Sequence, residues 1–214
     1  MLALLHTSPV HVPVFDALRD EAHPGLELRH FVDEGLLERA RATGPHTVAA
    51  DVRAAVDRAV AGGARAVLCT CSTIGAVAEA YGAEAGVPVL RVDRPMAAAA
   101  VAAGERVVVL AALESTLAPT VELIEEEARR AARPVAVRTV LVDGAWERFE
   151  AGDTDGYVRL VAAAADAVAD VDADAIVLAQ ASMAAAVDLV TTRVPLLSSP
   201  RPGLTAGAQA SHGA

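Results

Sequence analysis

A cysteine at the end of an apolar run is the strongest candidate for chemistry in this sequence. Cys71 follows the run AVLCT at residues 66–70 and precedes Ser72 and Thr73, so it stands where a buried strand stops and a helix begins. A helix start favours the thiolate form of a cysteine, which is the form that attacks carbon or takes up a proton. Cys69 lies inside the apolar run and is expected to be a buried packing residue. For Cys71 the residues leave open a proton-transfer or nucleophilic role and a packing role.

Small polar side chains follow several other apolar runs. Ligands of α/β proteins bind at the carboxyl ends of strands, where helix starts present backbone N–H groups that hold an anion. The candidates for holding a small carboxylate are Thr7, Ser8, Ser72, Thr73, Ser115, Thr116, Gln180 and Ser182. Ser and Thr also favour helix N-caps, and for any single residue the capping role is the better supported. Several such residues meeting in one cleft would favour a small anionic ligand.

The elements that would position these residues alternate along the chain. Apolar runs without polar alternation predict buried strands at residues 2–6, 26–31, 66–70, 87–92, 106–111, 135–142, 175–179 and 196–197. Amphipathic, Ala-rich stretches predict helices at residues 12–21, 47–61, 74–85, 96–103, 117–132, 156–169 and 184–190. Alternating strands and helices indicate an α/β fold with parallel sheet covered on both faces.

An internal repeat divides the chain into two similar α/β lobes. The run AVLCTCST at residues 66–73 parallels IVLAQASM at residues 176–183, and each is followed by an Ala-rich helix and a Val-Pro strand. We expect a first lobe of residues 1–95 plus 198–214 and a second lobe of residues 96–197, with a cleft between their carboxyl strand edges. The last residues of the tail, rich in Gly, Ser and Pro, are expected to be disordered.

Composition excludes several kinds of chemistry. All 18 basic residues are arginine, so no Schiff base and no Walker A phosphate loop can form. No GxGxxG follows a strand, and no further cysteine or histidine pair stands at metal-ligand spacing. A net charge of −10 without a basic cluster argues against nucleic acid. We expect no cofactor, no metal and no membrane span, and the absence of a signal sequence favours a reducing cytoplasm.

Two short motifs carry a resemblance to a known family. The run AVLCTCST resembles the first cysteine motif of the aspartate/glutamate/hydantoin racemase superfamily, with Cys71 at the family cysteine. The run AIVLAQASM at residues 175–183 resembles the second motif, a strand ending in Leu-Gly-Cys, in its hydantoin racemase form. The resemblance covers nearly the whole chain. It implies two pseudo-symmetric flavodoxin-like lobes, each a parallel four-stranded sheet flanked by helices, no cofactor, an active site between the lobes, and a homodimer.

The resemblance also implies roles for the candidate residues. In the family's racemases, paired cysteines on opposite faces of the substrate remove and return the α-proton. Thr7 and Ser8 match residues after the first strand that help to hold substrate, and Ser115 and Thr116 match the corresponding loop of the second lobe. Ser72 and Thr73 match residues whose amides and hydroxyls hold the substrate carboxylate.

One position departs from the family pattern. Gln180 stands where the second cysteine is expected, and an amide neither donates nor accepts a proton usefully near neutral pH. The chain therefore resembles a member that lacks the second catalytic cysteine. One thiol can still protonate a carbanion left by decarboxylation, attack an activated double bond, or exchange a proton on one face.

The sequence predicts a cofactor-independent isomerase of the racemase type that acts at the α-carbon of a small carboxylate, such as an amino acid. Cys71 would be the acid/base, and Gln180 and Ser182 would orient the substrate. A single-cysteine decarboxylase or a cis–trans isomerase of a dicarboxylate is the first alternative. A non-catalytic protein that binds a small carboxylate is the second, supported by the missing cysteine. The residues do not indicate which carboxylate is the substrate.

Overall fold

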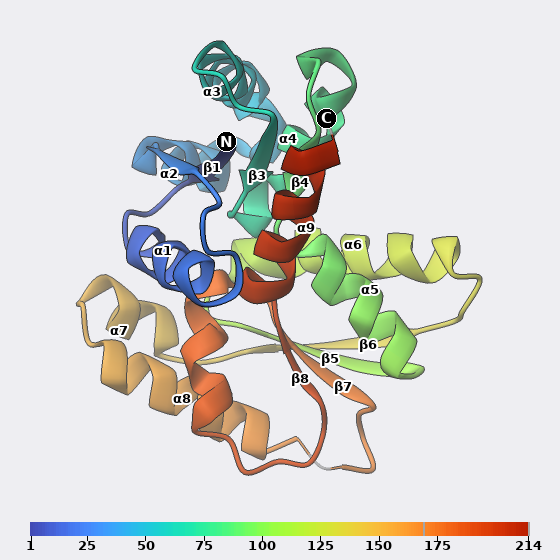
Figure 1. Cartoon of the computed structure of the whole chain (residues 1–214). Coiled ribbons are helices and arrows are strands. Elements are labelled where there is room, and N and C mark those ends of the chain that lie inside the picture. Colours follow the sequence, from blue (N-terminus) through green and yellow to red (C-terminus); the bar gives the residue numbers. More distant parts are fainter. Residues whose placement is uncertain (169, 214) are drawn as a thin grey trace. The chain divides into compact units, whose positions relative to one another are not determined.

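The computed structural model describes residues 1–168 and 170–213, and the chain forms two compact units. The first unit comprises Met1–Arg94 and Pro200–Ala214, and the second comprises Pro95–Ser199. Because the C-terminal helix belongs to the first unit, the second unit is one continuous segment inserted into the first. Each unit contains one sheet with helices on both faces (Figure 1).

The first unit is built on a parallel sheet with the strand order β2-β1-β3-β4. Its elements are β1 (Leu2–His6), α1 (His11–Ala22), β2 (Leu28–Val32), α2 (Glu34–Thr43), the 3-10 helix η1 (Pro45–Val48), α3 (Ala49–Ala61), β3 (Ala66–Cys69), α4 (Ser72–Ala85), β4 (Val89–Arg91) and α9 (Pro200–Gly213). In the register, Leu4 on the central strand β1 lies opposite His30 on β2 and Leu68 on β3.

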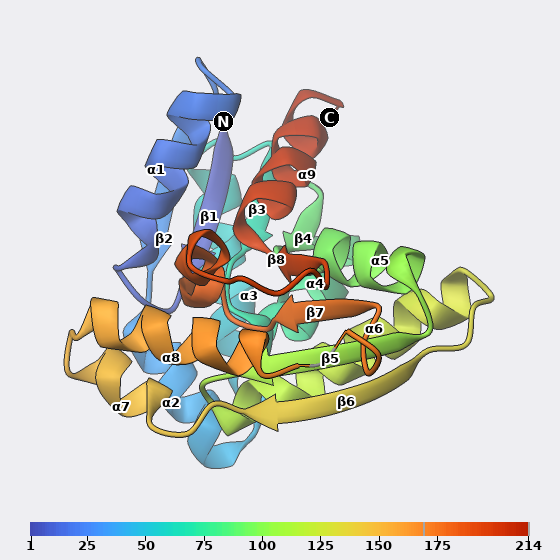
Figure 2. The same ribbon diagram turned by 90° about the horizontal axis from the view of Figure 1, so that it is seen from below.

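Successive residues of β1 enter different cores, because side chains alternate across a strand. Leu2 and Leu4 pack with Phe15 of α1 and Leu204 of α9. On the other face, Ala3, Leu5 and Cys69 pack with residues of α2, α3 and α4. Figure 2 shows α1 and α9 on one side of β1 and β3, with α3 and α4 on the other. Both faces of this sheet are therefore buried.

The second unit repeats the same topology, with the parallel strand order β6-β5-β7-β8. Its elements are α5 (Arg94–Ala103), β5 (Arg106–Ala111), the 3-10 helix η2 (Glu114–Thr116), α6 (Leu117–Arg130), β6 (Ala136–Leu141), α7 (Ala145–Glu150), α8 (Thr154–Asp166), β7 (Ala175–Leu178), the 3-10 helix η3 (Ala181–Asp188) and β8 (Leu196–Ser198). Helices α5 and α6 cover one face of this sheet, and α7 and α8 cover the other (Figure 1).

The α/β class, the parallel sheets and the eight predicted strands are confirmed, with strand ends differing by one or two residues. Among the described residues, three α-helices were not predicted: α2, α7 and α9. The helix predicted at 184–190 is instead the 3-10 helix η3, which begins directly after Gln180. The helix predicted at 156–169 is α8, which ends at Asp166, and Ala169 lies outside the described residues.

The prediction of a disordered tail is wrong, because residues up to Gly213 form α9. The small residues that suggested disorder are the ones that let this helix approach the sheet. A Cβ at Gly203 would lie 2.4 Å from the carbonyl oxygen of Val92, and one at Gly207 would lie 2.9 Å from Leu2.

The prolines of α9 are also compatible with a helix. Pro200 and Pro202 stand in the first turn, where a missing N–H costs no helical hydrogen bond. Ala214 lies outside the described residues.

Among the described residues, no helix has the length and apolar character needed to cross a membrane.

Candidate active site

Cys71 lies at the junction between β3 and α4. It is the N-cap residue of α4, in an extended conformation with φ −106° and ψ 116°, and its side chain is only half-buried. Ser72 and Thr73 form the first turn of α4 and are buried. The thiol therefore stands beside a helix start, where backbone N–H groups and the helix dipole favour a negative charge.

Cys69 has a different environment, although a single residue separates it from Cys71. Its side chain is fully buried in the core beneath α4, and its Sγ donates to the carbonyl oxygen of Cys71 at 3.7 Å. Burial raises the pKa of the Cys69 thiol far above its ordinary value, with Cys71 adding to the effect. The expectation that Cys69 is a buried packing residue is confirmed, and Cys71 is the more accessible thiol.

A buried ion pair lies next to this junction. Arg91, at the end of β4, donates from Nε and Nη2 to the two carboxylate oxygens of Asp93 at 2.7 and 2.9 Å. The two side chains are 3% and 0% exposed. Gly75 allows the arginine to pack against the first turns of α4, because a Cβ there would lie 3.1 Å from the Arg91 Cβ. The pair therefore supports the helix whose start carries Cys71.

Thr7 and Ser8 follow β1 at the same carboxyl edge of the first sheet as Cys71. Thr7 is buried and Ser8 is half-buried, in the bend that leads to α1. Strands β1 and β3 are direct neighbours in the sheet, so the loops after them emerge side by side. Of the nine predicted site residues, Cys71, Ser72, Thr73, Thr7 and Ser8 thus share one edge of the first unit.

The remaining predicted residues belong to the second unit, at the carboxyl ends of β5 and β7. Ser115 and Thr116 form the 3-10 turn η2 before α6. Thr116 is buried, and its carbonyl oxygen accepts from Thr120 Oγ1 at 2.8 Å. Ser115 Oγ is buried without a hydrogen-bond partner among the described residues. A hydroxyl in this state is open to a polar ligand atom.

Gln180 is held in one orientation. Its Oε1 accepts a hydrogen bond from the backbone N–H of Ala112 at 2.6 Å. Only the oxygen of an amide can accept from an N–H, so the contact fixes which end of the amide is which and leaves the NH₂ group as a donor. The arrangement suits holding an oxygen of a ligand and does not supply a proton acid or base.

Ser182 is fixed by a residue that the sequence did not single out. Its Oγ hydrogen-bonds the phenol of Tyr157 on α8 at 2.8 Å. Burial raises the pKa of Tyr157 to about 12, so this phenol is neutral at physiological pH. A tyrosine in an amphipathic helix is ordinarily a core residue, so the sequence held no signal for this contact.

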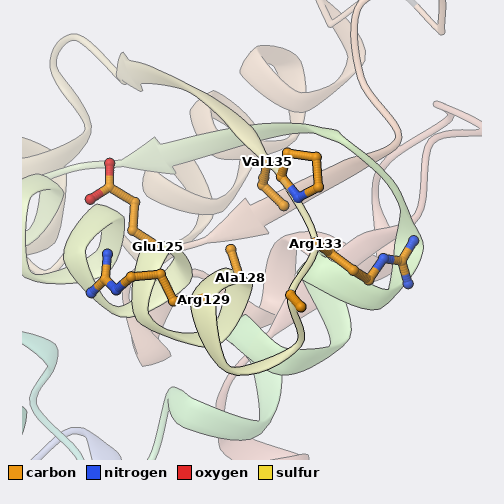
Figure 3. A pocket seen from close by; sticks show the side chains of 7 residues that line it. Glu125, Ala128, Arg129, Arg133 and Val135 are labelled. Carbon is orange, nitrogen blue, oxygen red and sulfur yellow. The ribbon is translucent and has the colours of Figure 1, made fainter.

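A surface pocket on the second unit lies apart from these residues. It is lined by residues from the C-terminal half of α6 and the segment that follows: Glu125, Ala128, Arg129, Ala132, Arg133, Pro134 and Val135. Figure 3 shows Ala128 and Val135 between Glu125 and Arg129 on one side and Arg133 on the other. None of these is a predicted site residue. No cluster of three or more histidine, cysteine, aspartate or glutamate side chains suited to a metal occurs among the described residues.

The chain consists of two repeats of one four-stranded parallel unit, each with small polar residues after its strands, and so belongs to the class of two-lobed α/β proteins. A model of the family described as Asp/Glu/Hydantoin racemase matches residues 10–206. The chain belongs to this family. No curated protein sequence matches it.

Solved structures share the fold. The aspartate racemase of Picrophilus torridus aligns with a TM-score of 0.71 at 14% identity, over 99% of this chain and 94% of that one. The allantoin racemase of Klebsiella pneumoniae gives a TM-score of 0.67 at 16% identity, over 97% and 86%. A glycine-to-cysteine mutant of arylmalonate decarboxylase gives 0.62 at 20% identity, over 99% and 93%.

Proposed function

We propose that the chain is a cofactor-independent isomerase of the racemase family that acts at the α-carbon of a small carboxylate, with Cys71 as its acid/base. Family membership supports an isomerase. The observation that carries the assignment to Cys71 is the contrast between the two thiols: Cys71 is half-buried at a helix start, whereas Cys69 is fully buried in the core.

The chemistry assigned to Cys71 is a proton transfer. Its thiolate takes the α-proton, so that the C–H bond breaks, an S–H bond forms, and the electron pair passes into the carboxylate as an enolate. Ser72, Thr73, Thr7 and Ser8 would hold the carboxylate through hydroxyls and backbone N–H groups, which stabilise the growing oxyanion charge. The S–H then exchanges with solvent, so its return to the same face of the carbon leaves deuterium there, whereas protonation of the enolate by solvent on the opposite face would invert the centre.

The candidate residues of the second unit would orient the substrate. Ser115 and Thr116 would add hydroxyl contacts, Gln180 would donate from its fixed amide, and Ser182 would act from its contact with Tyr157. None of these side chains is an acid or base at neutral pH.

The fixed amide of Gln180 favours a second candidate, in which one thiol is enough. In a decarboxylase, the bond between the α-carbon and a carboxyl group breaks. Carbon dioxide leaves, the bonding electron pair stays on the α-carbon, and the Cys71 S–H gives its proton to the resulting carbanion. In a cis–trans isomerase of an unsaturated dicarboxylate, the Cys71 thiolate adds to the double bond, the new single bond rotates, and the thiolate leaves. Either reaction needs only one catalytic side chain.

Cys71→Ala compared with Cys69→Ala tests the proposal. We would incubate the wild type with amino acids, hydantoins, malonates and maleate in deuterated water. Proton NMR would then follow loss of the α-proton, appearance of the decarboxylated acid, or conversion to fumarate. The reaction rate of Cys71→Ala should be about 10²–10⁴-fold lower than that of the wild type, which is the usual contribution of a positioned acid or base. Cys69→Ala should keep its rate and lose only stability.

Equal loss in both variants, or none in either, would contradict the role of Cys71. A non-catalytic binding protein would instead show saturable binding of a small carboxylate by calorimetry. It would catalyse no exchange, decarboxylation or isomerisation of any compound in the panel.

A further inference from the structure

Four polar side chains of the first unit form one hydrogen-bonded chain across three strands. His6 on β1 is fully buried, and its Nε2 lies 2.8 Å from His30 Nδ1 on β2. Its Nδ1 lies 2.7 Å from Thr70 Oγ1, directly after β3. His30 Nε2 in turn lies 3.4 Å from a carboxylate oxygen of Asp16 on α1. The chain therefore runs from a partly exposed carboxylate to the residue between Cys69 and Cys71.

The ring of His6 packs against three other rings. It stacks on His30 with ring centres 5.1 Å apart, and it packs against Phe15 and His11 of α1 at 5.7 and 6.2 Å. The charged or titratable groups around it are His30, His11 and Asp16, which also pairs with Arg19 at 3.3 Å. Burial, with smaller effects of His11 and His30, lowers the pKa of His6 to about 3, so the ring is neutral at physiological pH.

A neutral imidazole donates from one nitrogen and accepts at the other, which couples the members of the chain. When Thr70 donates to the carbonyl oxygen of Leu5, 3.1 Å away, His6 Nδ1 donates to Thr70 and His6 Nε2 accepts from His30. When Thr70 donates to His6 Nδ1 instead, its side-chain bond to Leu5 is lost and His6 Nε2 donates to His30 Nδ1. In both states Thr70 is bound to the ring of His6, and its backbone N–H also donates to Leu5 at 3.0 Å.

Thr70 is the last anchored residue before Cys71. Strand β3 ends at Cys69, and the Cys71 side chain makes no capping hydrogen bond to α4. The extended backbone of Cys71 is thus held by α4 on one side and by Thr70 on the other. A thiol benefits from a helix start only while its backbone keeps it there.

We propose that His6 is a positioning residue for Cys71, which acts by holding Thr70 and so keeps the thiol at the start of α4. The inference rests on the proposed function only in taking Cys71 as the reacting group. Its test measures the thiol itself and needs no substrate.

The test is the rate of alkylation of Cys71 by iodoacetamide at pH 7 in the folded full-length protein. Both cysteines fall in one tryptic peptide, residues 66–91, so fragmentation of that peptide must assign the label. Thr70→Val removes the hydroxyl and keeps the shape of the side chain. We expect Cys71 to react about fivefold more slowly in this variant, through loss of its alignment with the helix start. Thr70→Ser restores the hydroxyl and should restore the rate.

Two variants of His6 separate positioning from packing. Both remove the same ring from its contacts with Phe15 and His11, so a purely structural role would affect them equally. Asn places its amide where Nδ1 lies and can still bind Thr70, whereas Gln reaches toward His30 and loses that contact. We expect His6→Asn to stay within about twofold of the wild-type rate and His6→Gln to be as slow as Thr70→Val. Circular dichroism and melting temperature verify folding.

The chain offers a matched control. His23 and Thr205 form another histidine–threonine pair in the same unit, with Nε2 and Oγ1 3.1 Å apart, between the end of α1 and α9. Thr205→Val should react at the wild-type rate. The proposal is overturned if Thr70→Val reacts like the wild type, if Thr205→Val is equally slow, or if the two His6 variants do not differ. Should Cys71→Ala keep full turnover, the proposed function fails while the effect of His6 on the thiol still stands.

Discussion

The two thiols show how strongly position along one short segment decides the chemistry of a side chain. Cys69 is the last residue of β3 and lies in the core, where a thiolate would lose its hydration. Cys71 lies beyond the end of β3 and is half-buried beside the N–H groups of α4. In the second unit, backbone and phenol contacts hold Gln180 and Ser182 in single orientations. These two side chains of the second unit are thus fixed before any ligand binds.

The buried histidine His6 should make the protein less stable as the pH falls. Its pKa is about 3 in the folded chain and 6.5 in a model peptide. Between these values the unfolded chain binds a proton that the folded chain does not, so the free energy of unfolding decreases as the pH is lowered from 6.5. The slope from His6 is at most about 1.4 kcal/mol per pH unit. Urea unfolding at pH 7, 5.5 and 4.5 should show a shallower decline for His6→Asn than for the wild type.

A control separates this titration from a general loss of stability. Leu204→Ala empties a buried site on α9 and should lower the free energy of unfolding by about 2–5 kcal/mol at neutral pH. It removes no titrating group, so its dependence on pH should parallel that of the wild type. Identical slopes for His6→Asn and the wild type would contradict the assignment. His11, whose pKa burial lowers to about 4, adds a decline of the same sign in both proteins.

The sequence predicts the strand-end positions of the candidate residues, because an apolar run followed by Ser, Thr or Cys defines a strand's carboxyl end. It also separates Cys71 from Cys69 by their places in that run. It cannot predict the partners, since His6 and Thr70 are 64 positions apart and Tyr157 and Ser182 are 25 apart. Such pairs arise from strand register and helix packing, which single-sequence patterns do not specify.

Among the elements, α9 shows why composition misled the prediction. Gly, Ser and Pro disfavour an isolated helix, yet this helix is stabilised by packing on the sheet rather than by intrinsic propensity. Its small residues leave room for Val92 and Leu2, while Leu204 and Ala208 fill the core. The long apolar strands were predictable because burial on both faces leaves a continuous apolar pattern. Helix α2 is short and buries only Leu36 and Ala40, so its amphipathic pattern spans little more than one turn.

Gly203→Ala tests the close packing of α9. Alanine favours a helix by about 1 kcal/mol over glycine, so propensity alone predicts stabilisation. The new methyl group would instead meet the backbone of Val92 at 2.4 Å, and backbone cannot rotate away. We expect a net loss of about 1–3 kcal/mol in the free energy of unfolding, measured by urea denaturation.

Gly213→Ala is the matched control in the same helix, because a Cβ there has no neighbour within 4 Å among the described residues. Its effect should be neutral or slightly stabilising. A stabilised Gly203→Ala protein would show that α9 does not pack as closely on Val92 as the distances indicate.

For the whole molecule, the repeated topology and the order of the segments decide which part can fold alone. Both cores of the second unit are made entirely of residues between 95 and 199. The first unit needs two segments, because its core on the α1 face combines Leu2, Leu4 and Leu68 with residues of α9. The sequence predicts the two similar units and assigns residues 198–214 to the first, and the contacts of α9 show how this segment completes the core of that unit.

A fragment of residues 95–199 should therefore fold by itself, whereas residues 1–94 should not. The second fragment would leave the face of β1 and β3 that α9 covers exposed to water, with Leu2, Leu4 and Leu68 uncovered. Urea denaturation followed by circular dichroism should show a cooperative transition for residues 95–199 and none for residues 1–94. Joining residues 200–214 to residues 1–94 through a flexible linker should restore a cooperative transition, and adding Gly203→Ala to that chain should weaken it. A non-cooperative fragment 95–199, or a cooperative fragment 1–94, would show that the contacts of α9 do not determine which unit folds independently.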